Sequence, residues 1–218
     1  MRLVPAEWKT LAEFLYLQRV TGFTVPPDIY FAGAEDAFRE RLSRSRSYLE
    51  YGSGSSTLHA ARAGVPTVSV EADRYFARAV RALLPAEAPV RFAEPDIGLT
   101  LGLCRPYNTT PTPRRMRRWA RYVQAPWALL DGFPDFILTD GRFRLACMLE
   151  AVRRARAGGH RATLMCDDYV NRPRYHGIES HAGPPHIVGR AAFFEIGPDD
   201  TRPAITVEMV HAALADWY

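Results

Sequence analysis

Lysine is almost absent from this sequence. Lys9 is the only lysine among the 28 lysine and arginine residues, so arginine carries nearly all of the positive charge. The formal net charge is +4, and solvated surface residues explain a mildly basic balance of this size. The scarcity of lysine also leaves little support for chemistry in which a lysine assists a tyrosine in hydride transfer.

The cysteines form neither a metal-binding nor a disulfide pattern. Cys104, Cys147 and Cys166 include no CxxC pair and no Cys/His cluster with zinc spacing. An odd number of cysteines without such a pattern favours a reducing cytoplasm. Cys147 and Cys166 lie in apolar runs, as buried thiols do.

Long apolar runs are missing as well. No stretch approaches the ~20 apolar residues that a membrane span needs. Pro5, Glu7 and Lys9 stand where a signal peptide would need an apolar run. We therefore expect a soluble, cytoplasmic protein with no membrane partner.

The stretch from Ser47 to Asp73 has the pattern of a βαβ unit. A short strand ends in the glycine turn 52–56, a helix follows, and the β-branched strand Thr67–Val70 ends at Glu71. A glycine turn lets a ligand approach the backbone, and the helix start offers unpaired N–H groups. An acid at the second strand tip can accept hydrogen bonds from ribose hydroxyls. The stretch predicts a nucleoside-cofactor site.

Strands and helices alternate along most of the chain. The apolar spacing predicts helices over 8–20, 34–44, 57–63, 74–84, 114–130 and 142–156, and strands over 47–51, 67–70, 90–93, 133–139 and 162–166. Two further strands, Ile187–Ile196 and Ala204–Val210, would be joined by the turn Gly197-Pro198-Asp199-Asp200. Such alternation predicts a three-layer, Rossmann-like α/β fold. Its mostly parallel sheet would carry helices on both faces and a C-terminal antiparallel β-hairpin.

We expect one compact unit, with residues 1–45 as an N-terminal helical cap and residues 46–218 as the main domain. Ligands of such sheets bind at the carboxyl ends of the strands. This rule gathers several strand-tip residues on one rim, namely Gly52, Gly54, Glu71, Asp96, Asp140 and Asp167.

The glycine turn resembles a known motif. Glu50-x-Gly52-x-Gly54-x-Ser56 is similar to the first motif of class I S-adenosylmethionine-dependent methyltransferases, acid-x-Gly-x-Gly-x-Gly, with Ser56 in the last glycine position. Five βα steps followed by a terminal hairpin also resemble that family. The resemblance implies S-adenosylmethionine as the cofactor, with the glycine turn beside its amino-acid part, Glu71 at its ribose and Asp96 by its adenine. The implied cofactor-binding residues are Glu50, Gly52, Gly54, Ser55, Ser56, Glu71, Ala72, Asp96 and Ile97.

Two alternatives to a methyltransferase stay open. An NAD(P)-dependent oxidoreductase would need the pattern G-x-G-x-x-G/A, whose last position falls on Thr57 and would crowd the packing of helix on strand. The position of Glu71 suits both patterns and does not decide between them. A non-catalytic cofactor-binding module would carry the same residues as an enzyme.

Residues after the fourth strand are candidates for the acceptor side. Methyl transfer is a direct displacement, in which the protein aligns the reactants and in some cases supplies a base. Asp140 could orient or deprotonate an acceptor hydroxyl or amine, or it could cap the helix that starts at Arg142. Arg142 and Arg144 stand at a helix start, where the dipole disfavours cations. They would serve an anionic ligand or pair with Asp140 or Asp167.

Residues after the fifth strand complete the predicted site. Asp167-Asp168-Tyr169 could bind a metal, as in some catechol-type methyltransferases, or line the acceptor pocket. We predict no metal, because adjacent side chains on a strand point in opposite directions and only a turn would bring both carboxylates to one ion. His176, on the next loop, could act as a base or be solvated.

The predicted function is S-adenosylmethionine-dependent methyl transfer to oxygen or nitrogen of a small or polar acceptor. A small-molecule acceptor is the expected partner, and a homodimer is compatible with the sequence. The basic run Arg114–Arg118 could contact nucleic acid, but such runs are usually solvated, so nucleic acid is not favoured. The loop Leu99–Pro113 could be an acceptor lid. The predicted catalytic residues are Asp140, Asp167 and His176, and the predicted substrate-binding residues are Tyr107, Arg142, Arg144, Tyr169 and Arg172.

Overall fold

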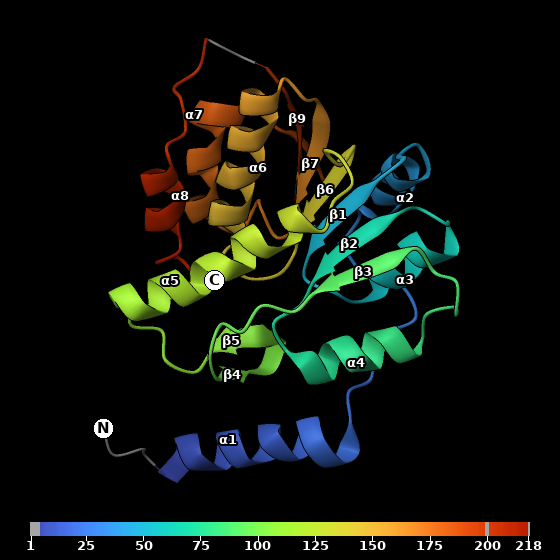
Figure 1. Cartoon of the computed structure of the whole chain (residues 1–218), viewed down its shortest axis with the longest axis vertical. Helices are drawn as coiled ribbons and strands as arrows, with labels where there is room; N and C mark the ends of the chain where they lie inside the picture. The colour runs from blue at the N-terminus through green and yellow to red at the C-terminus, as the bar shows by residue number, and fades with distance from the viewer. Residues whose placement is uncertain (1–4, 199–200, 218) are drawn as a thin grey trace.

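A seven-stranded sheet forms the centre of the protein (Figure 1). The structure is a computed structural model that describes residues 5–198 and 201–217, with side chains from residue 10 onward. The strand order is β3-β2-β1-β6-β7-β9-β8. The strands are β1 Tyr48–Tyr51, β2 Thr67–Val70, β3 Val90–Ala93, β6 Phe136–Thr139, β7 Ala162–Cys166, β8 His186–Val188 and β9 Ala191–Ile196. The strands β1, β2, β3, β6 and β7 run parallel, whereas β9 is antiparallel to both of its neighbours.

The central strands are buried at every position. This holds for β1, β2, β6 and β7 and explains why they read as nearly continuous apolar runs. Tyr48 of β1 stands opposite Thr67 on one side and Phe136 on the other. Its ring packs 5.3 Å from that of Phe136. A sheet that is apolar on both faces requires cover on both faces.

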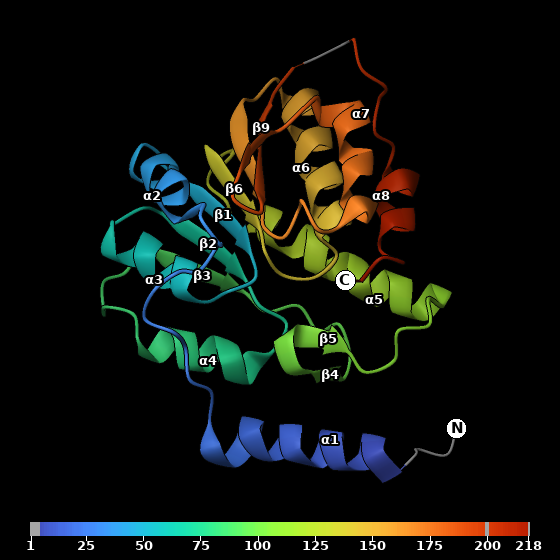
Figure 2. The same cartoon turned by 180° about the vertical axis from the view of Figure 1, so that it is seen from behind.

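Helices provide that cover in two layers (Figure 2). The helices α5 (Pro113–Gln124), α6 (Arg144–Gly158) and α8 (Val207–Ala213) pack on one face, where the largest apolar cluster lies. The helices α2 (Glu35–Ser43), α3 (Ser55–Arg62) and α4 (Arg74–Ala82) lie over the other face with two smaller clusters. The predicted three-layer, mostly parallel Rossmann-like fold is confirmed.

Helix α5 shows how local sequence sets these layers. Thr112 precedes it and accepts a hydrogen bond from the Arg115 N–H at 3.3 Å, and Pro113 begins the helix. Met116, Trp119 and Tyr122 then recur at helical spacing and are buried against the sheet. The arginines of the basic run therefore lie on the opposite side of the helix.

The C-terminal part differs from the prediction. Both β8 and β9 lie within or next to the predicted single strand Ile187–Ile196, and the chain reverses at Gly189-Arg190. A Cβ on Gly189 would collide with the backbone of Ala32, so only glycine fits this turn.

The predicted strand Ala204–Val210 is wrong, because helix α8 starts at Val207. The Thr206 side chain accepts a hydrogen bond from the Met209 N–H at 3.3 Å and caps the helix. Val210 is buried on the inner face of the helix. The β-branched residues before the helix resemble a strand in sequence. The segment nevertheless forms a helix, because Thr206 caps it and Val210 packs inward. Asp199 and Asp200 of the predicted turn lie outside the described residues.

Three connecting segments complete the chain. The predicted loop Leu99–Pro113 contains a small hairpin, with β4 (Thr100–Leu101), a 3-10 turn (Gly102–Cys104) and β5 (Arg105–Pro106). At the N-terminus, α1 (Pro5–Tyr16) continues as a π-helix (Leu17–Thr21) that contacts α4 (Figure 1). The remaining short helices are the 3-10 turns Ala125–Ala128 and Pro173–Ile178 and the helix α7 (Glu179–Ala182). Among the described residues, no helix combines the length and apolarity that a membrane crossing requires.

Candidate functional site

A pocket of about 560 Å³ lies at the carboxyl ends of β1, β2, β6 and β7. The residues that follow these strands contribute its floor, and the N-terminal segment and the β4–β5 hairpin contribute its walls. The lining residues are Phe14, Phe23, Thr24, Pro26, Gly52, Ser53, Glu71, Asp73, Phe76, Leu103, Cys104, Tyr122, Asp140, Gly141, Arg142, Arg144, Asp167, Asp168, Arg172 and Arg190. The pocket therefore occupies the rim where the topology predicts a ligand.

Two glycines bring the turns after β1 and β6 into contact. Gly52 has φ +107°, and a Cβ there would lie 2.8 Å from the Gly141 nitrogen. A Cβ on Gly141 would in turn collide with the hydroxyl of Tyr122. Glycine is therefore required at both positions, because the two backbones meet directly at the pocket floor.

Glu50 lies beneath the glycine turn, outside the pocket lining. It is completely buried and accepts hydrogen bonds from the hydroxyls of Tyr48 at 3.1 Å, Ser56 at 2.5 Å and Thr57. Thr57 Oγ1 also accepts the N–H of Gly54 at 2.9 Å. Burial raises the pKa of Glu50, and the hydroxyl donors oppose that rise. The acid of the motif shapes the turn and the start of α3.

Glu71 is the strand-tip acid that faces the pocket. Its side chain accepts the Asp73 N–H at 2.8 Å and the Cys104 thiol at 2.5 Å. Burial raises the pKa of Glu71 to about 7, and the hydrogen bonds from Cys104 and Asp73 act in the opposite direction. The residue is 5% exposed, so its carboxyl group is available only from within the pocket.

The acid after β3 lies outside the pocket lining. Asp96 is exposed, accepts the Gly98 N–H at 2.9 Å and forms an ion pair with Arg118 of α5, which lowers its pKa. Ile97 is buried in the main core, and Ala72 packs against that core. The structure does not bring these three predicted cofactor-binding residues to the pocket lining.

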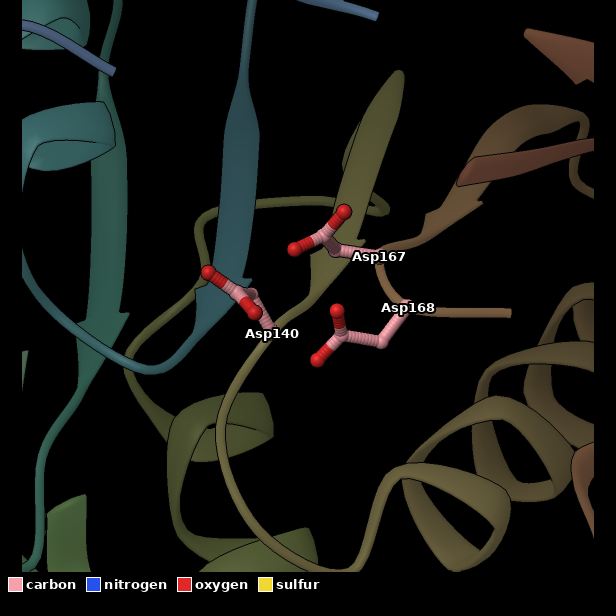
Figure 3. Close-up of side chains that lie close together, drawn as sticks. All are labelled: Asp140, Asp167 and Asp168. Atoms are coloured by element: carbon pink, nitrogen blue, oxygen red, sulfur yellow. The ribbon is translucent and has the colours of Figure 1, made fainter. Parts of the chain in front are cut away.

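Three carboxylates meet at the other end of the pocket (Figure 3). Each of Asp140, Asp167 and Asp168 offers an oxygen within 4.8 Å of the other two. The backbone of Asp168 is left-handed, with φ 55°. Adjacent carboxylates on a strand would point apart, and this turn is what brings the side chains of Asp167 and Asp168 to one place.

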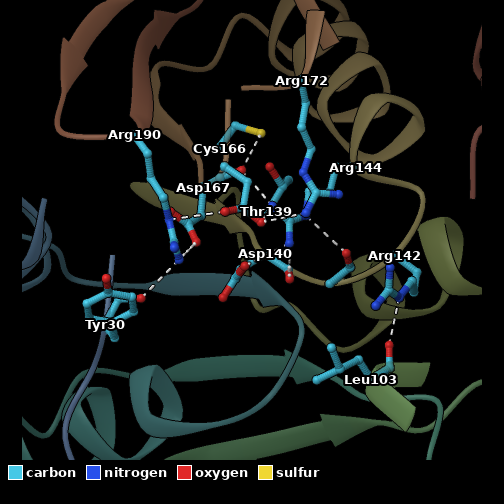
Figure 4. Close-up of polar contacts among 12 residues, drawn as sticks. Tyr30, Leu103, Thr139, Asp140, Arg142, Arg144, Cys166, Asp167, Arg172 and Arg190 are labelled. Atoms are coloured by element: carbon cyan, nitrogen blue, oxygen red, sulfur yellow. Dashed lines mark hydrogen bonds and ion pairs between the residues drawn. The ribbon is translucent and has the colours of Figure 1, made fainter. Parts of the chain in front are cut away.

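Arginines pair with these carboxylates (Figure 4). Arg144 contacts Asp140 at 2.9 Å and Asp168 at 3.2 Å. Arg190 donates to both oxygens of the buried Asp167, at 2.9 and 2.6 Å. Three oxygen ligands suit a hard divalent cation, which would have to compete with these guanidinium groups. The prediction of no metal stays a prediction.

Asp140 keeps a side chain that is 36% exposed toward the pocket. Its pKa is raised by burial and by the charges of Asp167 and Asp168, against the opposing charge of Arg144. A raised pKa makes a carboxylate a stronger proton acceptor. Asp140 does not cap α6, because the residue before this helix is Phe143 and no side-chain cap is made there.

Arg144 ties this end of the pocket together. It is 6% exposed and donates to the backbone oxygens of Asp140 at 2.8 Å, Gly141 at 3.1 Å and Asp167 at 2.6 Å. Of the two open hypotheses for this arginine, the structure favours the ion pair with Asp140. Arg144 therefore positions the strand ends after β6 and β7.

Tyr169 and His176 contact each other outside the pocket. Their rings stack with centroids 4.6 Å apart, and the Tyr169 hydroxyl donates to Glu179 at 2.7 Å. Tyr107 is also outside the lining, and its hydroxyl has no hydrogen-bond partner among the described residues. No pocket contact supports the predicted roles of these three side chains.

The pocket thus brings together only part of the predicted site. Its lining includes Gly52, Glu71, Asp140, Arg142, Arg144, Asp167 and Arg172. The other predicted residues lie outside the lining, namely Glu50, Gly54, Ser55, Ser56, Ala72, Asp96, Ile97, Tyr107, Tyr169 and His176.

One solved structure is similar enough to this chain, in both sequence and fold, to show its family. A methyltransferase-like protein (spo2022) from Silicibacter pomeroyi DSS-3 is 31% identical, with a TM-score of 0.72, over 89% of this chain and 100% of that one. This chain belongs to the class I S-adenosylmethionine-dependent methyltransferase-like superfamily. No protein-family model matches the sequence, and no curated protein does either.

Two other methyltransferases show weaker similarity. One is the Thermus thermophilus 16S rRNA N2 G1207 methyltransferase RsmC, solved with AdoMet and guanosine, at 15% identity and a TM-score of 0.41 over 87% of this chain and 47% of that one. The other is the CcbJ methyltransferase from Streptomyces caelestis, at 18% identity and a TM-score of 0.34 over 72% of this chain and 57% of that one.

Several lining residues of this methyltransferase-like protein escape prediction from sequence. Arg190 reaches the pocket from the β8–β9 turn, and the dipeptide Gly189-Arg190 between two apolar runs is the signal that could have indicated it. Phe14 and Phe23 come from the N-terminal segment, where nothing in the sequence marks a ligand contact. Cys104 has no motif around it and is placed only by the left-handed turn that contains it.

Proposed function

We propose that this protein transfers the methyl group of S-adenosylmethionine to an oxygen or nitrogen atom of a small, polar acceptor. Membership of the methyltransferase-like superfamily supports methyl transfer in general terms. The observation that carries the proposal is Glu71, a buried carboxyl group at the tip of β2 in the same pocket as the glycine turn and Asp140. The pocket offers about 560 Å³ for the two ligands.

The cofactor would lie across the ends of β1 and β2. The turn at Gly52-Ser53 would face its amino-acid part, and Glu71 would accept hydrogen bonds from its ribose hydroxyls. When bound, the cofactor supplies a methyl group activated by a sulfonium. The backbone contact of Gly52 with Gly141 keeps this turn beside the residues after β6, and thus beside the acceptor.

The β4–β5 hairpin would have to shift when the cofactor binds. The Cys104 thiol now donates to Glu71 at 2.5 Å, on the carboxyl group that the ribose hydroxyls would use. Arg142 Nε holds the same turn by donating to the Leu103 carbonyl oxygen at 2.6 Å. Withdrawal of Cys104 would leave Glu71 free to bind ribose, so the hairpin would serve as a lid.

Asp140 would accept the proton that the acceptor loses. Its pKa is raised above that of an ordinary carboxyl group, which makes it a stronger proton acceptor, and its side chain faces the pocket. Arg144 fixes the position of Asp140 through its side chain and its backbone oxygen. The protein would then contribute alignment of the two reactants together with a positioned base.

Calorimetric titration of the purified chain with S-adenosylmethionine and, separately, with NAD tests the proposal. We expect heat of binding with S-adenosylmethionine only. The variant Glu71→Gln should weaken that binding about tenfold, the usual cost of a lost hydrogen bond to a charged group. Glu87→Gln is the matched control, since Glu87 is exposed on the surface. Binding of NAD without binding of S-adenosylmethionine would contradict the proposal.

A further inference from the structure

Arg142 differs from the other arginines of the pocket. Arg144, Arg172 and Arg190 each form an ion pair with Asp167 or Asp168, at 2.6 to 3.2 Å. Among the described residues, no carboxylate lies within ion-pair distance of Arg142. One pocket arginine therefore keeps an uncompensated charge.

The guanidinium of Arg142 uses only part of its hydrogen-bonding capacity. Its Nε donates to the Leu103 carbonyl oxygen at 2.6 Å, and Figure 4 shows the side chain beside that residue, apart from the contacts of Arg190 with Asp167. Within the described part of the chain, its two Nη groups make no hydrogen bond. These groups form the edge of the fork that binds a carboxylate with two parallel hydrogen bonds.

The surroundings of Arg142 make the free charge costly. The side chain is half-buried in the pocket wall, and burial followed by the nearby charge of Arg144 lowers its pKa. The groups that oppose this shift are Tyr122, Cys104 and Tyr175, none of which is a carboxylate. A half-buried cation next to a second cation is stabilised by an anionic ligand.

We propose that Arg142 binds the carboxylate of the methyl acceptor, so that the acceptor is a small organic acid. Arg142 stands two residues after Asp140, on the β6 side of the pocket, whereas the glycine turn after β1 would take the amino-acid part of the cofactor. The hydroxyl or amine of the acceptor would face Asp140 while its carboxylate pairs with Arg142. That this carboxylate belongs to a methyl acceptor rests on the proposed function, whereas a carboxylate site at Arg142 does not depend on it.

Binding of carboxylates against their neutral amides tests this assignment. The probes are acetate against acetamide and benzoate against benzamide, titrated into the full chain by NMR. At least one acid should bind about tenfold more tightly than its amide, as expected for a charge-assisted pair in a partly buried site. Arg142→Gln should abolish this preference, and Arg142→Lys should retain part of it. Arg117→Gln, on the exposed face of α5, should behave as the wild type.

These titrations separate the carboxylate site at Arg142 from the proposed function. Equal binding of acid and amide by the wild type, or a preference that survives in Arg142→Gln with an unchanged melting temperature, would overturn the proposal. Loss of S-adenosylmethionine affinity in Arg142→Gln, with the acid preference intact, would assign Arg142 to the cofactor and overturn it too. Failure of the wild type to bind S-adenosylmethionine, with the Arg142-dependent acid preference present, would refute the proposed function and leave the carboxylate site standing.

Discussion

At the scale of single residues, the decisive group is a carboxyl side chain that is buried without a cation. Glu71 is stabilised by the Asp73 N–H and the Cys104 thiol, and no arginine acts on its pKa among the main causes. Burial therefore prevails, and the pKa rises from 4.5 to about 7. Such a group is costly to ionise in the folded state, which is typical of functional sites.

Glu71 should make the folded protein less stable as the pH rises. Below pH 4.5 the side chain is protonated in both states and costs nothing. Between 4.5 and about 7 the unfolded chain releases the proton while the folded protein retains it, so the free energy of unfolding falls with pH. Above pH 7 the loss of unfolding free energy reaches its full size, about 3 kcal/mol.

Urea unfolding of the wild type and of Glu71→Gln, from about pH 4 to about pH 8, measures this loss of stability. The difference in unfolding free energy between the two proteins reports on Glu71 alone, because Asp140 is present in both. As the pH rises across that range, Glu71→Gln should become increasingly more stable than the wild type. A difference that does not change with pH would show that Glu71 ionises normally.

At the scale of elements, strand positions were predictable and side-chain directions were not. The strands β2, β3 and β7 have the predicted limits, because each is a short, mostly apolar run that ends at an acidic residue. Strand order then places Glu71, Asp140 and Asp167 on one rim, as predicted. The direction of Asp168 depends on a left-handed backbone that sequence does not reveal, and the hairpin at the end of the sheet was misplaced for the same reason at Gly189.

Helix α8 stands where a strand was predicted, and its N-terminal cap should contribute measurably to the free energy of unfolding. Thr206→Ala removes the hydrogen bond to the Met209 N–H and should lower the free energy of unfolding by about 1 kcal/mol. Thr206→Ser keeps the cap oxygen and serves as the control. Equal stability of the wild type and Thr206→Ala in urea would mean that the segment does not depend on this cap.

The 3-10 turn of the proposed lid carries two non-glycine residues in the left-handed region. Leu103 has φ 57° and ψ 35°, and its side chain is 86% exposed, so it contributes little packing. Leu103→Gly should therefore stabilise the protein by about 0.5 kcal/mol, since the relief of backbone strain slightly exceeds the entropy cost of glycine. Leu99→Gly, in the same loop at an ordinary φ, should be destabilising. The two variants are compared by chemical denaturation, and a loss of stability in Leu103→Gly would refute the strain.

At the scale of the whole molecule, ion pairs join the edge of the sheet to its centre. Arg190 comes from the β8–β9 turn, and it donates to Asp167 at the end of β7 and to the Tyr30 carbonyl oxygen in the N-terminal connector at 3.2 Å. Asp167 is 1% exposed, so its charge relies on Arg190 for compensation. The pocket end, the sheet edge and the N-terminal connector therefore share one polar network.

Removal of Arg190 should damage the whole fold. Arg190→Met would leave the Asp167 carboxylate buried without its main partner and should cost about 3 kcal/mol of unfolding free energy. The exposed pair Arg41–Glu195 offers the control, because Arg41→Met should cost less than about 1 kcal/mol. Thermal unfolding of both variants checks this ranking, and similar melting temperatures would show that the Asp167 pair contributes no more than a surface pair.

A crystal structure with S-adenosylhomocysteine tests the central claim most directly. We expect the ribose hydroxyls within hydrogen-bond distance of Glu71, the amino-acid part beside Gly52-Ser53, the sulfur on the side of Asp140, and Cys104 withdrawn from Glu71. A structure in which Cys104 still contacts Glu71 while the ligand lies elsewhere would contradict the assignment of this pocket to the cofactor.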